Sequence, residues 1–243
     1  MMRMLLALLL LLPLPLAAQD RAVTVFAAAS LRDALGAIAQ DFGTPVRFSF
    51  GGSGSMARQV AAGAPADVVV LAHKDWMAWL VAGGHVDTDA VRSVASGQLV
   101  LIGQTGGAAL TTPDSATLKA ALDGGRLAIG QRDSVPAGSY ARDWLRHIGA
   151  WDALKPHLAE TDNVRAALAL VAQGAAPLGV VYAADAAADP RVSVRYAIPP
   201  DSHAPITYPA AALTPAGAAF VAHLGSPAAQ ARLRQYGFGP ESG

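Results

Sequence analysis

Hydroxyl and amide side chains stand in this sequence where a predicted strand gives way to a helix. Ser30 is the first, after the apolar, β-branched run Val23–Phe26, which is typical of a buried strand. Apolar residues at the spacing of one helix face follow it: Leu31, Leu35, Ile38 and Phe42. We therefore expect Ser30 to be a helix N-cap, with Asp33 as an acidic partner in the first turn. The unpaired N–H groups of such a helix start can bind an oxyanion.

A glycine-rich turn, Gly51–Ser55, separates the predicted strand Val46–Phe50 from the predicted helix Met56–Ala62. It offers Ser53 as a ligand-binding hydroxyl and Ser55 as a second candidate cap. Glycines let a backbone approach a ligand closely, although a plain flexible turn is an equal interpretation of this stretch alone. The turn resembles the nucleophile elbow of hydrolases but has serine where the last glycine belongs, and no Gly-Lys-Ser/Thr of a phosphate-binding loop follows.

Two further helix starts can offer backbone N–H groups. Ala137 precedes the predicted helix Gly138–Ile148 and has no functional side chain, so any role would use its N–H. Asn163 is a natural N-cap for the predicted helix Val164–Ala172, which leaves the N–H of Val164 for a ligand. An ordinary turn and an ordinary cap are the alternatives.

Tyr182 ends the apolar run Leu178–Tyr182, at the carboxyl edge where α/β sheets bind ligands. Its hydroxyl can donate to an oxyanion, and a partly buried core tyrosine is the alternative. Each helix N-terminus carries about half a positive charge and contributes on the order of 0.3–1 kcal/mol to a nearby anion. Several uncharged donors could therefore hold a dianion between two lobes without a counter-cation.

Strand and helix patterns alternate in two runs, Val23–Leu80 and Leu99–Tyr196, which predicts an α/β fold with largely parallel sheets. The remaining predicted strands are Asp67–Ala72, Leu99–Gly103, Arg126–Gly130 and Val192–Tyr196. The remaining predicted helices are Lys74–Val81, Leu118–Leu122, Pro215–Leu224 and Pro227–Gln235, the last two with proline in the first turn. Asp67 is expected to be structural, and the four tryptophans are expected in the core.

Residues 1–18 have the pattern of a secretory signal: Arg3, the apolar run Met4–Leu12, and the small-residue exit Leu16–Ala18. The chain has no cysteine, so we expect neither a disulfide nor lipid attachment. For a bacterial source these features predict a free protein in the periplasm. The apolar run is too short for a membrane span.

Charge and histidine spacing make other function classes less favourable. The 18 Lys+Arg balance 18 Asp+Glu, and no basic cluster suggests a nucleic-acid partner. The six histidines show no metal-ligand spacing. We therefore expect neither a direct metal ligand nor a catalytic residue.

The chain resembles the periplasmic molybdate-binding proteins of ABC transporters through an ordered set of motifs: Phe26–Leu31, Phe50–Gln59, Gly63–Asp67, Val135–Ala141, Asn163–Val171, Pro177–Tyr182 and Tyr236–Phe238. The resemblance implies a type II two-lobed binding-protein fold that closes on molybdate or tungstate. It implies one lobe from residues 19–98 with 203–243, and the other from residues 99–202. The oxyanion contacts that it implies are Ser30, Ser53, Ala137, Val164 and Tyr182.

The resemblance further implies a monomer that uses no cofactor, is not an enzyme and delivers its ion to a membrane permease. Two alternatives remain open from the sequence. One is a binding protein for another tetrahedral oxyanion, such as sulfate or phosphate. The other is an exported serine hydrolase that uses Ser30 or Ser53.

Overall fold

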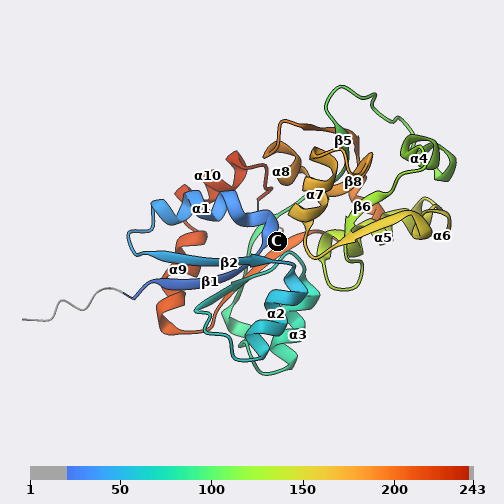
Figure 1. Ribbon diagram of the computed structural model, residues 1–243. Coiled ribbons are helices and arrows are strands. Elements are labelled where there is room, and N and C mark those ends of the chain that lie inside the picture. Colours follow the sequence, from blue (N-terminus) through green and yellow to red (C-terminus); the bar gives the residue numbers. More distant parts are fainter. Residues whose placement is uncertain (1–20, 241–243) are drawn as a thin grey trace, which may run out of the picture.

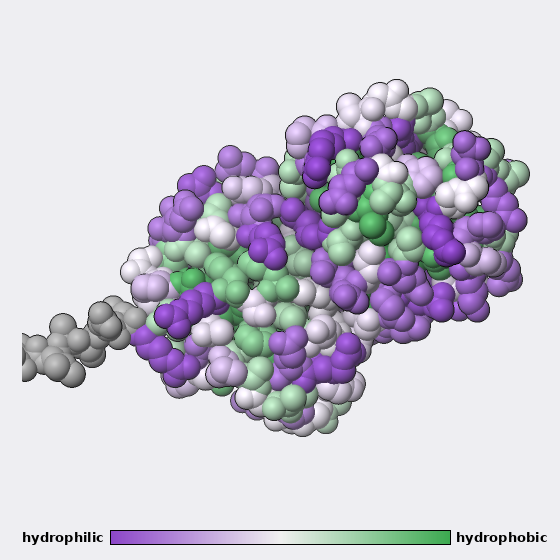
Figure 2. Space-filling view, in the orientation of Figure 1, coloured by the Kyte–Doolittle hydropathy of each residue, from purple (hydrophilic) through white to green (hydrophobic). Residues whose placement is uncertain are grey.

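Two α/β lobes lie side by side in the computed structural model, which describes residues 21–240 (Figure 1). Each lobe contains one five-stranded sheet with helices packed against it, so the two-lobed α/β fold expected from the sequence is confirmed. The space-filling view shows two rounded masses that meet at a narrower waist (Figure 2). The predicted signal, residues 1–18, lies outside the described residues. Within residues 21–240 no helix has both the length and the apolar character to cross a membrane.

Lobe I is the lobe whose sheet has the strand order β2-β1-β3-β10-β4. Its strands are β1 (Val23–Ala28), β2 (Val46–Gly51), β3 (Val68–Val70), β4 (Val91–Ser96) and β10 (Thr207–Ala212). Its helices are η1 (Ala29–Leu31), α1 (Arg32–Gln40), α2 (Ser53–Ala61), α3 (Lys74–Ala82), η2 (Thr88–Ala90), α9 (Pro215–Leu224) and α10 (Pro227–Gln235). Strands β1, β2 and β3 are parallel, whereas β10 is antiparallel to both of its neighbours.

Lobe II is the lobe whose sheet has the strand order β7-β6-β8-β5-β9. Its strands are β5 (Leu99–Gln104), β6 (Leu127–Gly130), β7 (Leu158–Thr161), β8 (Leu178–Tyr182) and β9 (Val192–Ala197). Its helices are α4 (Ser115–Leu122), α5 (Pro136–His147), α6 (Trp151–Leu154), η3 (Lys155–His157), α7 (Val164–Ala172), α8 (Ala183–Ala187) and η4 (Pro200–Ser202). Only β5 runs against the other strands of this sheet.

The chain crosses between the sheets twice, and these crossings explain the one reversed strand in each sheet. Residues 97–98 join β4 to β5, and residues 198–206 join β9 to β10. In both lobes the parallel strands end at the edge of the sheet that faces the other lobe. The chain therefore enters each sheet at that edge after a crossing. The first strand after the crossing, β5 or β10, must run away from the other lobe and is antiparallel to its neighbours. The N–H of Gly97 donates to the carbonyl of Ile206 (3.1 Å), so the two crossing segments lie side by side.

The apolar run at the start of β1 is buried on both faces of its sheet. Val25 packs with the core under α1, α9 and α10, whereas Phe26 points to the opposite face and packs with residues of α2 and α3. Val70 and Val69 of β3 divide between the same two cores. Two-sided burial explains why both faces of these strands carry apolar residues, instead of one apolar face and one polar face.

Three strands and two short helices were not expected from the sequence: β4, β7, β10, α6 and α8. Strand β10 contains Pro209, which argues against a central strand because proline has no N–H for the ladder. The structure accommodates it where the register between β10 and β4 shifts, between Tyr208 and Pro209.

The expectation that all tryptophans lie in the core is wrong. Trp144 is fully buried, but Trp79 is 45% exposed, because α3 buries Met77 and Leu80 instead.

Candidate oxyanion-binding site

A small cavity between the lobes, at the carboxyl ends of β1, β2 and β8, brings together all five predicted contact residues: Ser30, Ser53, Ala137, Val164 and Tyr182. Lobe I contributes the two serines and lobe II the other three. The cavity contains about 190 Å³ of empty space, part of it open to solvent. Only about 10 Å³ of it can hold the centre of a water molecule, far below the roughly 300–1,000 Å³ of pockets for drug-sized molecules, so any ligand here must be very small.

Ser53 is the first residue of α2 and is fully buried. Its Oγ accepts a hydrogen bond from the N–H of Ala72 (3.0 Å), which leaves its own hydroxyl proton free for another acceptor. Ser55 lies inside α2 and does not line the cavity; its Oγ accepts from Nε2 of Gln59 (3.1 Å). Helix α2 thus begins three residues before the predicted Met56, and Ser53 is the serine that it places at the cavity.

Ser30 does not cap α1, so this part of the prediction is wrong. The chain first makes the 3₁₀ turn η1, α1 then starts at Arg32, and its N-cap residue is Leu31. The extra turn places Ser30 at the cavity wall, where its Oγ lies 3.3 Å from the hydroxyl of Tyr208. Asp33, expected to support the cap, instead forms an ion pair with Arg165 of the other lobe (2.7 Å).

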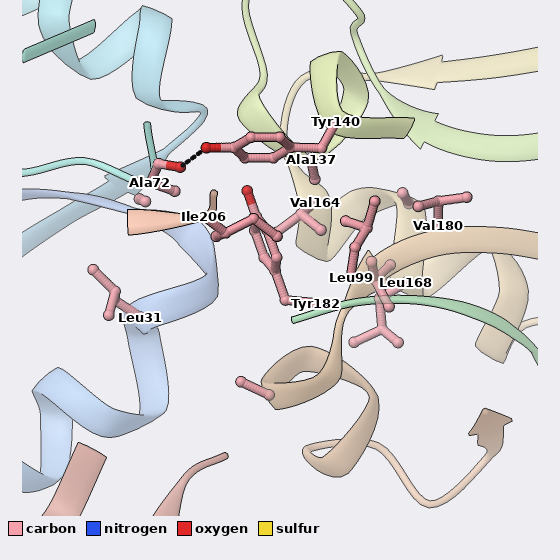
Figure 3. Packing of buried hydrophobic residues seen from close by; sticks show 14 of the residues in the cluster. Leu31, Ala72, Leu99, Ala137, Tyr140, Val164, Leu168, Val180, Tyr182 and Ile206 are labelled. Carbon is pink, nitrogen blue, oxygen red and sulfur yellow. Dashed lines mark hydrogen bonds between the residues drawn. The ribbon is translucent and has the colours of Figure 1, made fainter. Parts of the chain in front are cut away.

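Tyr182 ends β8 and is buried with its ring against Tyr208. Its hydroxyl lines the cavity and has no hydrogen-bond partner within residues 21–240. Figure 3 shows this hydroxyl directed toward the region between Ala72 of lobe I and Ala137 of lobe II. Burial raises the pKa of Tyr182 well above its ordinary value, so the group stays a neutral donor. A buried hydroxyl without a partner costs about 1–3 kcal/mol, and an anion in the cavity would remove that cost.

Two helix starts face the same cavity with N–H groups that no helical bond can use. Val164 is the first residue of α7 and Ala137 is the second of α5, and the first four N–H groups of a helix have no intrahelical acceptor. Asn163 caps α7 as predicted, because its side chain accepts from the N–H of Ala166 (3.0 Å). The Asn163 side chain thus binds the N–H of Ala166 and leaves the N–H of Val164 available for a ligand.

The glycines of the Gly51–Ser55 turn allow the lobes to touch each other. The N–H of Gly54 donates to the carbonyl of Ser134 in lobe II (3.0 Å). A Cβ atom on Gly54 would lie 2.6 Å from that carbonyl oxygen, and one on Gly52 would lie 2.6 Å from the carbonyl oxygen of Asp162. Any other residue would hold the lobes apart. This close approach of the backbone is to lobe II, a role that the sequence did not indicate, and the structure is the closed arrangement.

Every residue that lines the cavity is uncharged. Arg165 follows Val164 directly, but its guanidinium is bound by Asp33 and by the fully buried Asp185. Burial raises the pKa of Asp185 to about 6, and Arg165 opposes that rise, so Asp185 is an anion at neutral pH. Two carboxylates therefore more than neutralise the one nearby cation, and the attraction of an anion to the cavity depends on helix and hydrogen-bond dipoles. Within residues 21–240 no cluster of histidine, aspartate and glutamate could hold a metal ion.

Asp67 has the structural role expected of it. Its carboxylate accepts hydrogen bonds from the N–H of Thr24 (2.9 Å) and from Oγ1 of Thr214 (2.7 Å), and so connects β1 to the start of α9.

The sequence did not point to four other residues around the site: Ala72, Tyr140, Arg165 and Tyr208. Tyr208 lies on the unpredicted β10, and the others act through contacts between lobes that no local pattern reveals.

A closed two-lobed fold with a small, donor-lined cavity between the lobes defines a solute-binding protein. The chain belongs to the bacterial extracellular solute-binding protein family, whose model matches residues 23–239. It is 39% identical over 231 residues to the molybdate-binding protein ModA of Escherichia coli, covering 91% of this chain and 90% of the relative. It is 38% identical to ModA of Haemophilus influenzae, covering 89% of each chain.

The periplasmic molybdate-binding protein of Azotobacter vinelandii has the same fold, with a TM-score of 0.79 at 24% identity. The match covers 90% of this chain and all of that one. These comparisons confirm the resemblance that the motifs indicated.

Proposed function

We propose that this protein binds molybdate, and tungstate in the same way, in the periplasm and delivers it to an ABC-type membrane permease. The observation that carries the proposal is the unpartnered, buried hydroxyl of Tyr182 in a cavity with two serine hydroxyls and two free helix N–H groups. The names of the curated relatives support the choice of ion.

Recognition uses direct hydrogen bonds to the four oxygens of the ion, with no cofactor, no direct metal ligand and no covalent step. The five donors are the side chains of Ser30, Ser53 and Tyr182 and the N–H groups of Ala137 and Val164. Sulfate is the smaller ion and does not reach every donor at once, and each buried donor left unpaired costs about 1–3 kcal/mol. Protonated phosphate needs an acceptor, which none of the five positions supplies.

Transport follows from opening and closing of the lobes. The ion enters between open lobes, and closure brings donors from both lobes onto it. Within residues 21–240 the chain crosses between the two sheets only at residues 97–98 and 198–206, and we place the hinge there. The lobes are then residues 19–98 with 203–243, and residues 99–202. The closed monomer is the form that the permease recognises.

A serine hydrolase is not favoured by the contacts of the two serines. Ser53 bonds to a backbone N–H and Ser30 to a tyrosine hydroxyl, and neither partner can act as the general base that a serine nucleophile requires.

Isothermal titration calorimetry of the mature protein against molybdate, tungstate, sulfate and phosphate tests the proposal. We expect one-to-one binding of molybdate and tungstate and no heat from sulfate or phosphate. Binding of sulfate or phosphate instead would replace the substrate but keep the class of protein. Failure of all four ions to bind would overturn the proposal, and an ester-substrate panel would then test the hydrolase.

A further inference from the structure

Tyr208 lies in lobe I, on β10, directly behind the cavity. Its side chain is fully buried, and its hydroxyl is 3.3 Å from Oγ of Ser30. Tyr208 itself is not among the residues that line the cavity. Its ring packs edge-on against Tyr182 (5.9 Å between centroids) and Phe238 (5.2 Å). It therefore touches two of the proposed contact residues from behind, one in each lobe.

The direction of the Tyr208–Ser30 hydrogen bond follows from the surroundings of Tyr208. Within residues 21–240, Ser30 is the one hydrogen-bond partner of the Tyr208 hydroxyl. If Ser30 donated, the buried proton of Tyr208 would be left without an acceptor, which is the costly arrangement. Tyr208 therefore donates, and Ser30 accepts. Burial raises the pKa of Tyr208 well above its ordinary value, so this donor keeps its proton.

A serine hydroxyl that accepts on one side must direct its own proton elsewhere, because it has one proton and two lone pairs. For Ser30 the other direction is the cavity. Ser53 is arranged in the same way, since its Oγ accepts from the N–H of Ala72. The carbonyl of Ala72 in turn accepts from the hydroxyl of Tyr140 in lobe II (3.4 Å; Figure 3).

We propose that Tyr208 is a positioning residue for oxyanion recognition: it orients the Ser30 hydroxyl so that the serine donates its proton into the cavity. The proposal rests on the oxyanion-binding function proposed above and adds a residue that acts without touching the ion. Without the Tyr208 hydroxyl, the Ser30 hydroxyl rotates freely. Fixing its orientation then costs free energy when the ion binds.

Tyr208→Phe is a suitable test because the ring contacts with Tyr182 and Phe238 persist and only the hydroxyl is lost. We expect molybdate affinity to fall about threefold to tenfold, the range that one neutral hydrogen bond provides. The melting temperature of the ligand-free protein should change little. Tyr196→Phe is the matched control, because Tyr196 lies on β9, is partly buried and does not line the cavity. Its affinity should equal that of the wild type.

A double-mutant cycle separates positioning from general packing. Ser30→Ala, Tyr208→Phe and the double variant are titrated with molybdate by calorimetry. If Tyr208 acts through Ser30, adding Tyr208→Phe to Ser30→Ala causes no further loss. An equal loss in both backgrounds, or no loss in the single Tyr208→Phe variant, would overturn the proposal.

The same experiment distinguishes failure of this inference from failure of the proposed function. If wild-type protein does not bind molybdate, the proposed function is wrong, and there is no wild-type affinity with which to compare the variants. If wild type binds and Ser30→Ala weakens binding while Tyr208→Phe does not, the function stands and the positioning role is rejected.

Discussion

Arg165 of lobe II donates to Asp33 of lobe I across 2.7 Å, from the first turn of the helix whose first residue lines the cavity. Its Nη2 also lies 3.4 Å from the carbonyl oxygen of Ser30. Asp185, buried in lobe II, holds the other side of the guanidinium and accepts from the N–H of Tyr182 (3.3 Å). One arginine thus connects the closure of the lobes to residues of the candidate site on both sides.

The interlobe ion pair should favour the closed form, so Asp33→Asn should weaken molybdate binding. The Asp33 side chain is 40% exposed, and such pairs contribute about 0.2–1 kcal/mol, so we expect a loss of at most about fivefold in affinity. Calorimetry at low and high salt should also show a weaker salt dependence for the variant. The control is Asp189→Asn, which breaks an ion pair with Arg191 inside lobe II. Equal affinity and salt dependence for Asp33→Asn and wild type would contradict this account.

Loss of the Tyr182 hydroxyl should weaken oxyanion binding with little effect on folding. A hydrogen bond from a buried neutral donor to a charged acceptor contributes about 1.5–3 kcal/mol, so Tyr182→Phe should lose about tenfold to a hundredfold in affinity. The ligand-free melting temperature should stay the same or rise slightly, because the variant removes a buried hydroxyl without a partner. Calorimetry and thermal melts measure both effects. Unchanged affinity would remove Tyr182 from the site.

The two serines of the glycine-rich turn should behave differently. Ser53→Ala removes a hydroxyl at the cavity wall and should reduce molybdate affinity by at least about tenfold. Ser55→Ala, two residues further along α2, loses only a bond to Gln59 on the outer side of the helix and should bind like wild type. Titration of both variants with molybdate shows which of the two serines contacts the ion. A larger loss for Ser55→Ala would show that our assignment of this contact is wrong.

Gly52→Ala should impede closure without straining the backbone. Gly52 has φ −65° and ψ 139°, which any residue can adopt, but a Cβ would lie 2.6 Å from the carbonyl oxygen of Asp162 in lobe II. We expect at least about a tenfold loss of affinity, because the donors of the two lobes no longer reach the ion together. Small-angle scattering with saturating molybdate should show a larger radius of gyration than for wild type.

Gly36→Ala is the matched control for this change, because a Cβ at Gly36 meets no atom within 4 Å. The Gly36→Ala variant should have the molybdate affinity and the radius of gyration of wild type. If Gly52→Ala did the same, contact at this turn would not limit closure.

Affinity should be nearly independent of pH across the mildly alkaline range. Burial raises the pKa values of Tyr182 and Tyr208 well above their ordinary value, so both hydroxyls keep their protons there. Because the protonated form is the donor, a raised pKa extends binding to higher pH. We expect molybdate affinity between pH 7 and 9 to stay within about twofold. A steep fall within this range, accompanied by tyrosinate absorbance, would contradict the burial of these donors.

Local patterns in the sequence were sufficient for the α/β class and for several element boundaries, and they pointed to five residues that the structure places at the cavity wall. Helices α9 and α10 begin and end as predicted, since proline at the first turn marks a start within a few residues. Asn163 caps α7 as expected, because an N-cap bond spans only three residues. Strand β8 also has its predicted bounds, and every residue of its apolar run is buried.

Tertiary structure alone decided what depends on residues far apart in the chain. Arg165 and Asp33 are separated by 132 positions and meet only when the lobes close. Ser30 lines the cavity because η1 intervenes before α1, and its partner Tyr208 lies 178 positions away on a strand that Pro209 concealed. The glycines of the Gly51–Ser55 turn serve the approach of lobe II, which no local pattern encodes. Helix starts and strand ends are short-range properties of the chain, whereas their convergence on one cavity requires the packing of both sheets.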